Sequence, residues 1–201
     1  MSPALLAGRG MARLAWRAMP GYAACAALAG AVAIASLAAA PGLPGVFGAA
    51  LGLLMLAIAV ADARAYIIPD RLTLAAFVLA LAAAAVTGFA NIPENVALAA
   101  ARGLVLALAF FVLREIYFRL RQRHGIGLGD VKLAAAAGAW LDWPLIPVAV
   151  EIAAVLALTV YLASRLVLRR PISAASKLPF GLFFAPAIWF CWLLGALFLQ
   201  G

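Results

Sequence analysis

The stretch RQRHGIGLGDVKLAAAAGAW, residues 121–140, joins a basic loop to a run of small apolar residues, with an acid at the junction. Asp130 stands where the apolar run begins, and Lys132 follows two residues later. Alanine and glycine in such a run are typical of helices that pack closely inside a membrane. A carboxylate is costly in that setting, by about 2.5–3.5 kcal/mol at the bilayer centre on insertion scales. Asp130 therefore requires a structural or functional explanation.

The composition of the whole chain agrees with a membrane setting. Of the 201 residues, 69% are hydrophobic and 11% are charged, whereas soluble domains carry about 25% charged residues. A spanning helix needs about 20 mostly apolar residues, and the chain has room for several. We predict an all-α, polytopic membrane helical bundle that occupies residues 21–201. Residues 1–20, with three arginines on one helical stripe, form either an interfacial helix or a basic tail.

Seven helices are predicted, because stretches with proline and glycine divide the apolar sequence into seven runs. The fifth run is short for a span, so we expect it to begin earlier or to lie tilted inside the protein. The stretch SLAAAPG near the end of the first run resembles a signal-peptide cleavage site, and cleavage there would leave six spans in the same orientation. The predicted helices cover residues 21–40, 43–62, 71–90, 96–118, 129–142, 144–166 and 180–199.

The positions of the basic residues predict the orientation. The net charge of +8 comes from Lys and Arg between the apolar runs, which favours contact with membrane lipids and not with nucleic acid. The opposite loops hold Glu94 and Asp142, with Arg102 the only base nearby. The positive-inside rule then places the N-terminus in the cytoplasm and the C-terminus outside. The basic residues that decide this are Arg9, Arg13, Arg17, Arg64, Arg71, Arg119, Arg121, Arg123, Arg165, Arg169, Arg170 and Lys177.

Two acids at span boundaries share this predicted cytoplasmic side. Asp62 ends the second run and Asp130 begins the fifth. Each stands at one end of a stripe of small residues at helical spacing, and we expect two helices packed along these stripes to bring the acids together. The stripes are Gly45, Gly48, Gly52, Met55 and Ala59 before Asp62, and Ala134, Ala137 and Gly138 after Asp130.

Each charged residue also has a simpler interpretation. Asp62 would be satisfied by water or by Arg64, and Asp130 would cap the fifth helix. Lys132 would extend its ammonium group to the interface. The remaining expectations are an N-cap role for Asp70, a surface ion pair of Glu115 with Arg114 or Arg119, and a hydrogen bond inside the bundle for Glu151.

Paired carboxylates indicate a specific chemistry. Two that lie close together cannot both ionise easily, so one holds a proton that the pair shares. One then activates a water while the other protonates a carbonyl. Gly127 and Gly129 let a substrate backbone approach closely. Cys25, Cys191 and His124 are isolated in the sequence, so we expect neither a metal nor another cofactor.

Three motifs resemble those of the type IV prepilin peptidases. GIGLGDVKLAAAAGAW resembles the GxGDxKLxxxxG signature and aligns Asp130 with its acid. DARAYIIPDRLT resembles the first catalytic segment, in which an acid, here Asp62, precedes an Ile-Pro-Asp triplet by six residues. KLPFGLFFAPA resembles a late motif with a Pro-Phe-Gly core. The motifs occur in the family's order, from residue 62 to residue 181.

The resemblance implies an aspartic membrane peptidase of the bacterial inner membrane. Its substrates would be prepilins or pseudopilins, cut after a glycine at the cytoplasmic boundary, with Asp62 and Asp130 as the catalytic pair. The short form without the cysteine-containing insert of larger members resembles the peptidases of Flp-type tight-adherence pili. The missing insert also implies cleavage without methylation. The supporting residues carried over from the motifs are Gly127, Gly129, Lys132, Pro179, Phe180 and Gly181.

Other functions remain open at this point. A presenilin-like GxGD protease shares the acid of this signature, but it pairs it with a Tyr-Asp motif, whereas Asp62 follows an alanine. A proton-coupled transporter would use Asp62, Asp130 and Glu151 as a relay. A non-catalytic assembly subunit would keep the fold alone. The oligomeric state is not predicted.

Overall fold

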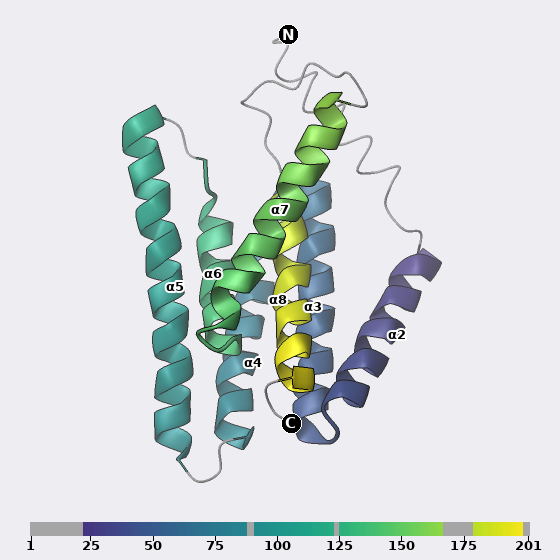
Figure 1. Ribbon diagram of the computed structural model, residues 1–201. Helices are drawn as coiled ribbons and strands as arrows, with labels where there is room; N and C mark the ends of the chain where they lie inside the picture. Colours follow the sequence, from purple (N-terminus) through teal and green to yellow (C-terminus); the bar gives the residue numbers. More distant parts are fainter. Residues whose placement is uncertain (1–21, 88–90, 123–124, 167–178, 199–201) are drawn as a thin grey trace.

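The computed structural model describes residues 22–87, 91–122, 125–166 and 179–198, and within these ranges it is built of helices alone. The seven predicted helices are confirmed (Figure 1). The basic segment 1–20 lies outside the described residues. The helices are α2 (Tyr22–Ala39), α3 (Leu43–Ala65), α4 (Asp70–Thr87), α5 (Ile92–Arg121), α6 (Leu128–Trp140), α7 (Leu145–Leu166) and α8 (Gly181–Phe198).

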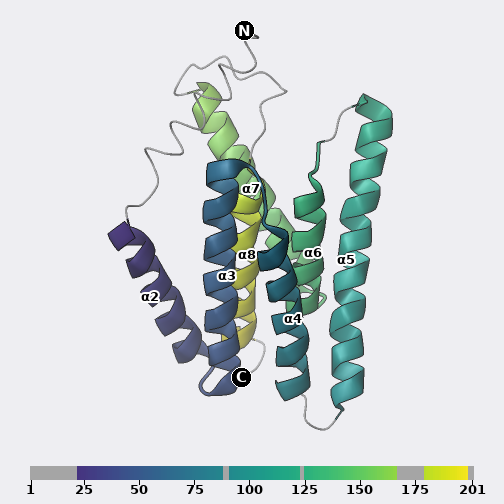
Figure 2. The same cartoon turned by 180° about the vertical axis from the view of Figure 1, so that it is seen from behind.

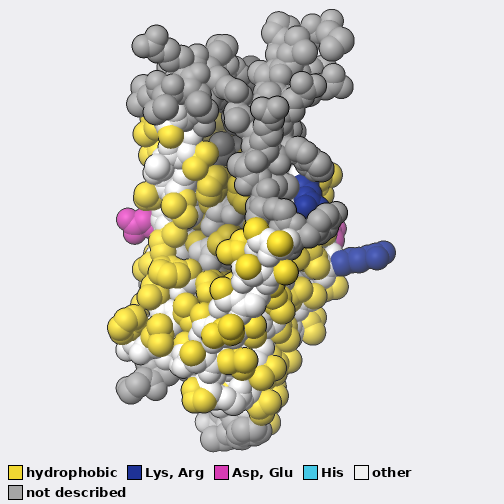
Figure 3. Space-filling view, turned by 90° about the vertical axis from the view of Figure 1, so that its right-hand side faces the viewer, with side chains coloured by type: hydrophobic (Ala, Val, Ile, Leu, Met, Phe, Trp, Pro, Cys, Tyr) yellow, Lys and Arg dark blue, Asp and Glu magenta, His cyan; other side chains and the backbone are white. Residues whose placement is uncertain are grey.

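Five of the helices, α3, α4, α5, α7 and α8, are long and apolar enough to cross a membrane. Their outward surfaces carry mostly hydrophobic side chains, as the face in Figure 3 shows. The protein is therefore a polytopic membrane protein. α6 has only 13 residues, which gives a length of about 20 Å at 1.5 Å per residue. That is less than the roughly 30 Å of a hydrocarbon core, as its sequence predicted.

α6 lies inside the protein, against α4, α5 and α8. Leu133 and Ala136 are among its fully buried residues. Such burial suits a helix too short to span, because backbone groups at membrane depth must find partners within the protein. The prediction that the fifth run sits inside the bundle is therefore confirmed.

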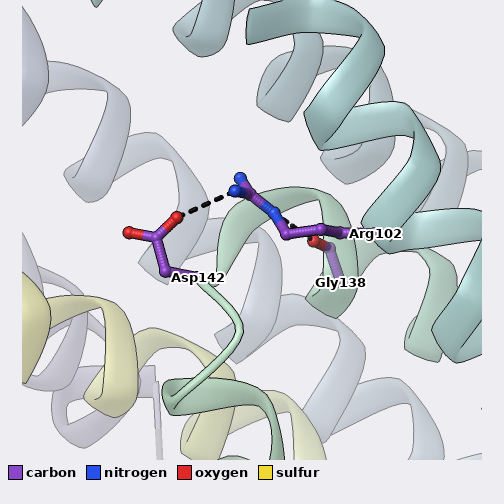
Figure 4. Close-up of polar contacts among 3 residues, drawn as sticks. All are labelled: Arg102, Gly138 and Asp142. Carbon is purple, nitrogen blue, oxygen red and sulfur yellow. Dashed lines mark hydrogen bonds and ion pairs between the residues drawn. The ribbon is translucent and has the colours of Figure 1, made fainter.

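Arg102 of α5 satisfies the C-terminal end of α6 (Figure 4). Its Nε donates to the carbonyl oxygen of Gly138 at 3.4 Å, and its Nη1 donates to Asp142 Oδ1 at 2.9 Å. The Arg102 side chain is only 18% exposed. A cation here also complements the negative end of the α6 dipole. Arg102, the base that the sequence places near this loop, thus stabilises the C-terminal end of α6.

Three helix ends meet at one end of the bundle, which we call the carboxylate end. The C-terminus of α3 and the N-termini of α6 and α8 all point to the top of Figures 1 and 2. α8 packs against α2, α3, α6 and α7. Together with the α3–α4 contact, it connects α2–α3 on one side with α4–α5–α6 on the other.

The small-residue stripe of α3 is buried, but it does not face α6. Gly48 lies against the ring of Trp192, and Gly52 lies against Val32 and Trp189. The glycines thus leave room for tryptophans of α8 and for α2. The expectation that this stripe packs on the stripe of α6 is wrong.

The stripe of α6 faces α5 instead. Gly138 lies against the backbone of Arg102 and Gly103, and a Cβ on Gly103 would lie 2.7 Å from the carbonyl oxygen of Ala135. The two backbones therefore approach too closely for side chains at these positions. Both stripes mark helix contacts, but each has a different partner.

Candidate active site

Asp62 lies in the last turn of α3 and is buried, with 5% of its surface exposed. Its Oδ2 accepts a hydrogen bond from the backbone N–H of Leu182 at 3.0 Å. Leu182 belongs to the first turn of α8, where the helix dipole favours a negative charge. The carboxylate is therefore held by the start of α8, and it is not a charge exposed at the membrane boundary.

Gly181 makes this contact possible. A Cβ built on Gly181 would lie 2.9 Å from Asp62 Oδ2 and 3.2 Å from its Cγ. Any side chain at this position would push the carboxylate away from the N–H of Leu182. The late Pro-Phe-Gly motif thus meets the first acid.

Asp130 occupies the third position of α6, and its Oδ2 accepts a hydrogen bond from the N–H of Gly127 at 3.0 Å. Gly127, not Asp130, is the N-cap residue. Asp130 reaches back to it, as an acid at this position does in a capping box. Asp130 therefore takes part in capping α6, as the sequence suggested, but the N-cap residue itself is Gly127.

Burial is the main reason why the pKa of Asp130 is raised to about 6; the hydrogen bond from Gly127 opposes this rise, and the charge of Asp62 adds a smaller one. Ile68, in the link between α3 and α4, lies between Gly129, which is next to Asp130, and Gly181, which contacts Asp62. Its Cβ would be 2.9 Å from a Cβ on Gly129, and its Cδ1 would be 2.8 Å from one on Gly181. The residues of all three motifs therefore meet around one isoleucine side chain.

Tyr66 makes the sharp turn after Asp62. Its φ of 54° is left-handed, and its N–H donates to the carbonyl oxygen of Asp62 at 2.8 Å. Burial, and next the charge of Asp62, raise the pKa of Tyr66. The sequence did not single out Tyr66, and its spacing of four residues from Asp62, about one helical turn, is the only signal that points to it.

Lys132 and Asp70 form an ion pair, with Nζ and Oδ1 2.6 Å apart. The expected N-cap role of Asp70 is wrong, because Asp70 is the first residue within α4 and its carboxylate accepts from Lys132. Lys132 likewise has a protein partner for its ammonium group. The pair joins the first turns of α4 and α6.

Phe180 anchors the start of α8. Its ring centroid lies 5.3 Å from that of Phe184 and 6.5 Å from that of Phe110 on α5. Pro179 precedes it at the end of the described segment and is partly buried. The carbonyl oxygen of Phe180 accepts from the N–H of Phe184 at 2.9 Å, which begins the helix. These residues fix where Gly181 meets Asp62.

The other acids do not join the site. Glu115 pairs with Arg119 at 3.0 Å, and Arg119 is one of the two partners predicted for it. Glu151 is exposed on α7, and the described residues offer it no hydrogen bond. The expected hydrogen bond inside the bundle is therefore wrong for Glu151. The acids brought together are Asp62 and Asp130.

A membrane helical bundle with two interacting acids at one end is the class of protein that the fold and the site define. Residues 49–162 match the model of the type IV leader peptidase family, and the chain belongs to this family. This matched region contains both acids.

Three relatives illustrate the similarity. A prepilin leader peptidase/N-methyltransferase of Aeromonas hydrophila is 30% identical over 141 residues, which is 70% of this chain and 47% of the relative. One of Burkholderia pseudomallei strain K96243 is 36% identical over 162 residues, 77% of this chain and 50% of the relative. Leader peptidase HopD of Salmonella typhimurium is 35% identical over 127 residues, 63% of this chain and 78% of the relative.

The chain spans about half the length of the two leader peptidase/N-methyltransferases. No solved structure matches.

Proposed function

We propose that this protein is an aspartic-type peptidase that cleaves the leader of type IV prepilins or pseudopilins, with Asp62 and Asp130 as the catalytic pair. One observation carries the proposal. Two acids from separate helices lie at the same end of the bundle, next to glycines that pack on Ile68, and each accepts a hydrogen bond from a backbone N–H. Family membership supports the class of reaction.

The geometry suits proton transfer by a carboxyl pair. Asp62 Oδ2 and Asp130 Oδ2 each accept a backbone hydrogen bond, which fixes the orientation of both groups. Preorganised groups of this kind need little rearrangement during reaction. Gly129 and Gly181, which flank Ile68, keep the lining of the site small.

In the proposed reaction, one carboxylate takes a proton from water as the water oxygen attacks the scissile carbonyl carbon. The other, protonated carboxyl group gives its proton to the carbonyl oxygen. When the tetrahedral intermediate collapses, the C–N bond breaks, the carbonyl re-forms and returns a proton to the second carboxylate. The leaving amine takes the proton held by the first.

The proposed substrates follow from the orientation. The positive-inside rule places the carboxylate end at the cytoplasmic face of a bacterial inner membrane. A prepilin presents a short basic leader at that face, ahead of an apolar helix that stays in the bilayer. The names of the relatives, prepilin leader peptidases, support this class of substrate. Within it, we propose the prepilins of Flp-type tight-adherence pili.

We further propose cleavage without methylation. The links of the carboxylate end that the structure describes are short: residues 66–69 join α3 to α4, and residues 125–127 precede α6. Neither has room for a folded module that would bind a methyl donor. Mass spectrometry of the mature pilin N-terminus tests this, and a methyl group that purified protein adds to a cleaved substrate would contradict it.

Cleavage itself is tested by co-expression with a prepilin from the same genome, in a bacterial host that lacks its own prepilin peptidase. A shift in pilin mobility on a gel reports loss of the leader. Asp62→Asn and Asp130→Asn should each abolish the shift, because an amide cannot exchange the proton. Glu115→Gln is the matched control, since it also replaces an acid by its amide near this end of the bundle.

The amounts of each variant in the membrane fraction are measured alongside. Cleavage at the wild-type rate by either Asp→Asn variant would refute the pair mechanism. No cleavage by the wild-type protein, at normal membrane levels, would refute the peptidase assignment for this prepilin class.

A further inference from the structure

The two acids are carried by helices that do not pack on one another along their lengths. α3 packs on α2, α4 and α8, whereas α6 packs on α4, α5 and α8. The separation of Asp62 and Asp130 is therefore set by what connects the α3–α4 link to the first turn of α6. Proton sharing between carboxyl groups depends steeply on that separation.

Two contacts make this connection at the carboxylate end. Ile68 packs against Gly129, next to Asp130. Lys132 donates from Nζ to Asp70 Oδ1 at 2.6 Å, a distance typical of a strong, charge-assisted hydrogen bond.

Farther along α6, Trp140 donates from Nε1 to the carbonyl oxygen of Ala76 on α4 at 2.8 Å, and Arg102 holds the C-terminal end. Beside Asp130, the apolar contact alone has little direction, because it rests on dispersion. The ion pair supplies the directional restraint.

Lys132 does not act on Asp130 directly. Residues two positions apart in a helix do not face each other, and the carboxylate of Asp130 turns back to Gly127. Lys132 instead reaches α4, whose first residue follows the acid-bearing helix α3 by a link of four residues. The ion pair thus ties the backbone that carries one acid to the backbone that carries the other.

We propose that Asp70 and Lys132 form a positioning pair that sets the separation of the Asp62 and Asp130 carboxyl groups. This inference rests on the proposed peptidase function. The pair is a positioning device and not a major source of stability, because both side chains are largely exposed, at 71% and 48%. Ion pairs with such exposure contribute little to folding.

The test is steady-state cleavage of the purified prepilin by purified enzyme in detergent. Asp70→Asn and Lys132→Met should lower kcat about 10- to 100-fold, the effect of a misplacement of about 1 Å in a catalytic constellation. KM should stay unchanged, because neither side chain is proposed to touch the substrate. Lys132→Arg, which keeps the cation, should remain within about threefold of the wild type.

The charge reversal Asp70→Lys with Lys132→Asp should recover most of the lost kcat. Glu115→Gln is the matched control, since it breaks the Arg119–Glu115 pair, 3.0 Å long and also exposed, that stabilises only α5. It should leave kcat unchanged. Rescue by reversal would separate positioning from a general effect on folding, which reversal of an exposed pair does not repair.

Wild-type kcat in Asp70→Asn would overturn the proposal. A rise in KM with unchanged kcat would also overturn it, because it would make Lys132 a substrate-binding residue. If the single variants were lost from the membrane, Lys132→Arg and the reversal would still decide. Failure of the proposed function has different signatures: no cleavage by the wild-type protein would refute the peptidase assignment, and wild-type cleavage by Asp62→Asn would refute the catalytic pair.

Discussion

Gly181→Ala separates the activity of this protein from its stability. The added methyl carbon would lie 2.9 Å from Asp62 Oδ2. Ordinary van der Waals contact begins at 3.4 Å, so the carboxylate or the start of α8 must move by about 0.5 Å (3.4 − 2.9). The hydrogen bond from the N–H of Leu182 to the same oxygen, now 3.0 Å, is the contact that we expect this movement to lengthen.

The magnitude follows from this bond. A hydrogen bond to a charged group contributes about 1.5–3 kcal/mol, and each 1.36 kcal/mol changes a rate tenfold. Loss of the bond should therefore lower kcat/KM by about 10- to 150-fold. Thermal stability should fall less than activity, because the helix propensity of alanine, higher than that of glycine by about 1 kcal/mol, offsets part of the loss.

The assay is cleavage of prepilin by purified protein, with thermal unfolding in the same detergent. Gly30→Ala is the matched control, because nothing lies within 4 Å of a Cβ at that position in α2. It should leave cleavage unchanged. Wild-type cleavage by Gly181→Ala would refute the inference that the start of α8 holds Asp62 for the proposed reaction. Equal losses of activity and thermal stability would refute the separation of the two.

Two further substitutions test the packing around the site. Gly48→Ala places a methyl group within the ring of Trp192, and overpacking of this kind costs about 1–3 kcal/mol. We therefore expect a lower unfolding temperature than that of Gly30→Ala. Equal temperatures would contradict the α3–α8 contact. Arg102→Leu removes the donors to Gly138 and Asp142. It should lower the unfolding temperature by a few degrees, as a loss of about 1 kcal/mol does in a domain of this size. An unchanged temperature would show that α6 does not need this partner.

The helices could be predicted from the sequence because apolar runs and their Pro and Gly boundaries are local features. The largest difference is in α5, which runs from Ile92 to Arg121 and not only over residues 96–118. Arg119 and Glu115 continue the helix as an i,i+4 pair. A prediction based on hydropathy ends where charges begin, whereas a helix ends where its backbone finds a cap, here at Gln122.

The site could be predicted only in part. The sequence predicted that Asp62 and Asp130 share one side, and they do stand at the same end of the bundle. Helical spacing does not specify which helix faces meet. The small-residue stripes therefore suggested a direct contact that does not exist. The ion pair of Lys132 with Asp70 was also missed, because each residue has a plausible local role near a helix end and the two are far apart in the sequence.

The start of α8 explains why Asp62 and Asp130 do not need to lie on helices that pack directly on each other. Two carboxylates on directly packed helices would be fixed against each other, without space for water or a peptide. Here the start of α8 approaches Asp62, and Ile68 separates Gly181 from Gly129. Each acid is therefore held from its own side by a backbone N–H, of Leu182 or Gly127. This arrangement requires the glycines beside the acids, because side chains at Gly181 and Gly129 would meet Asp62 and Ile68.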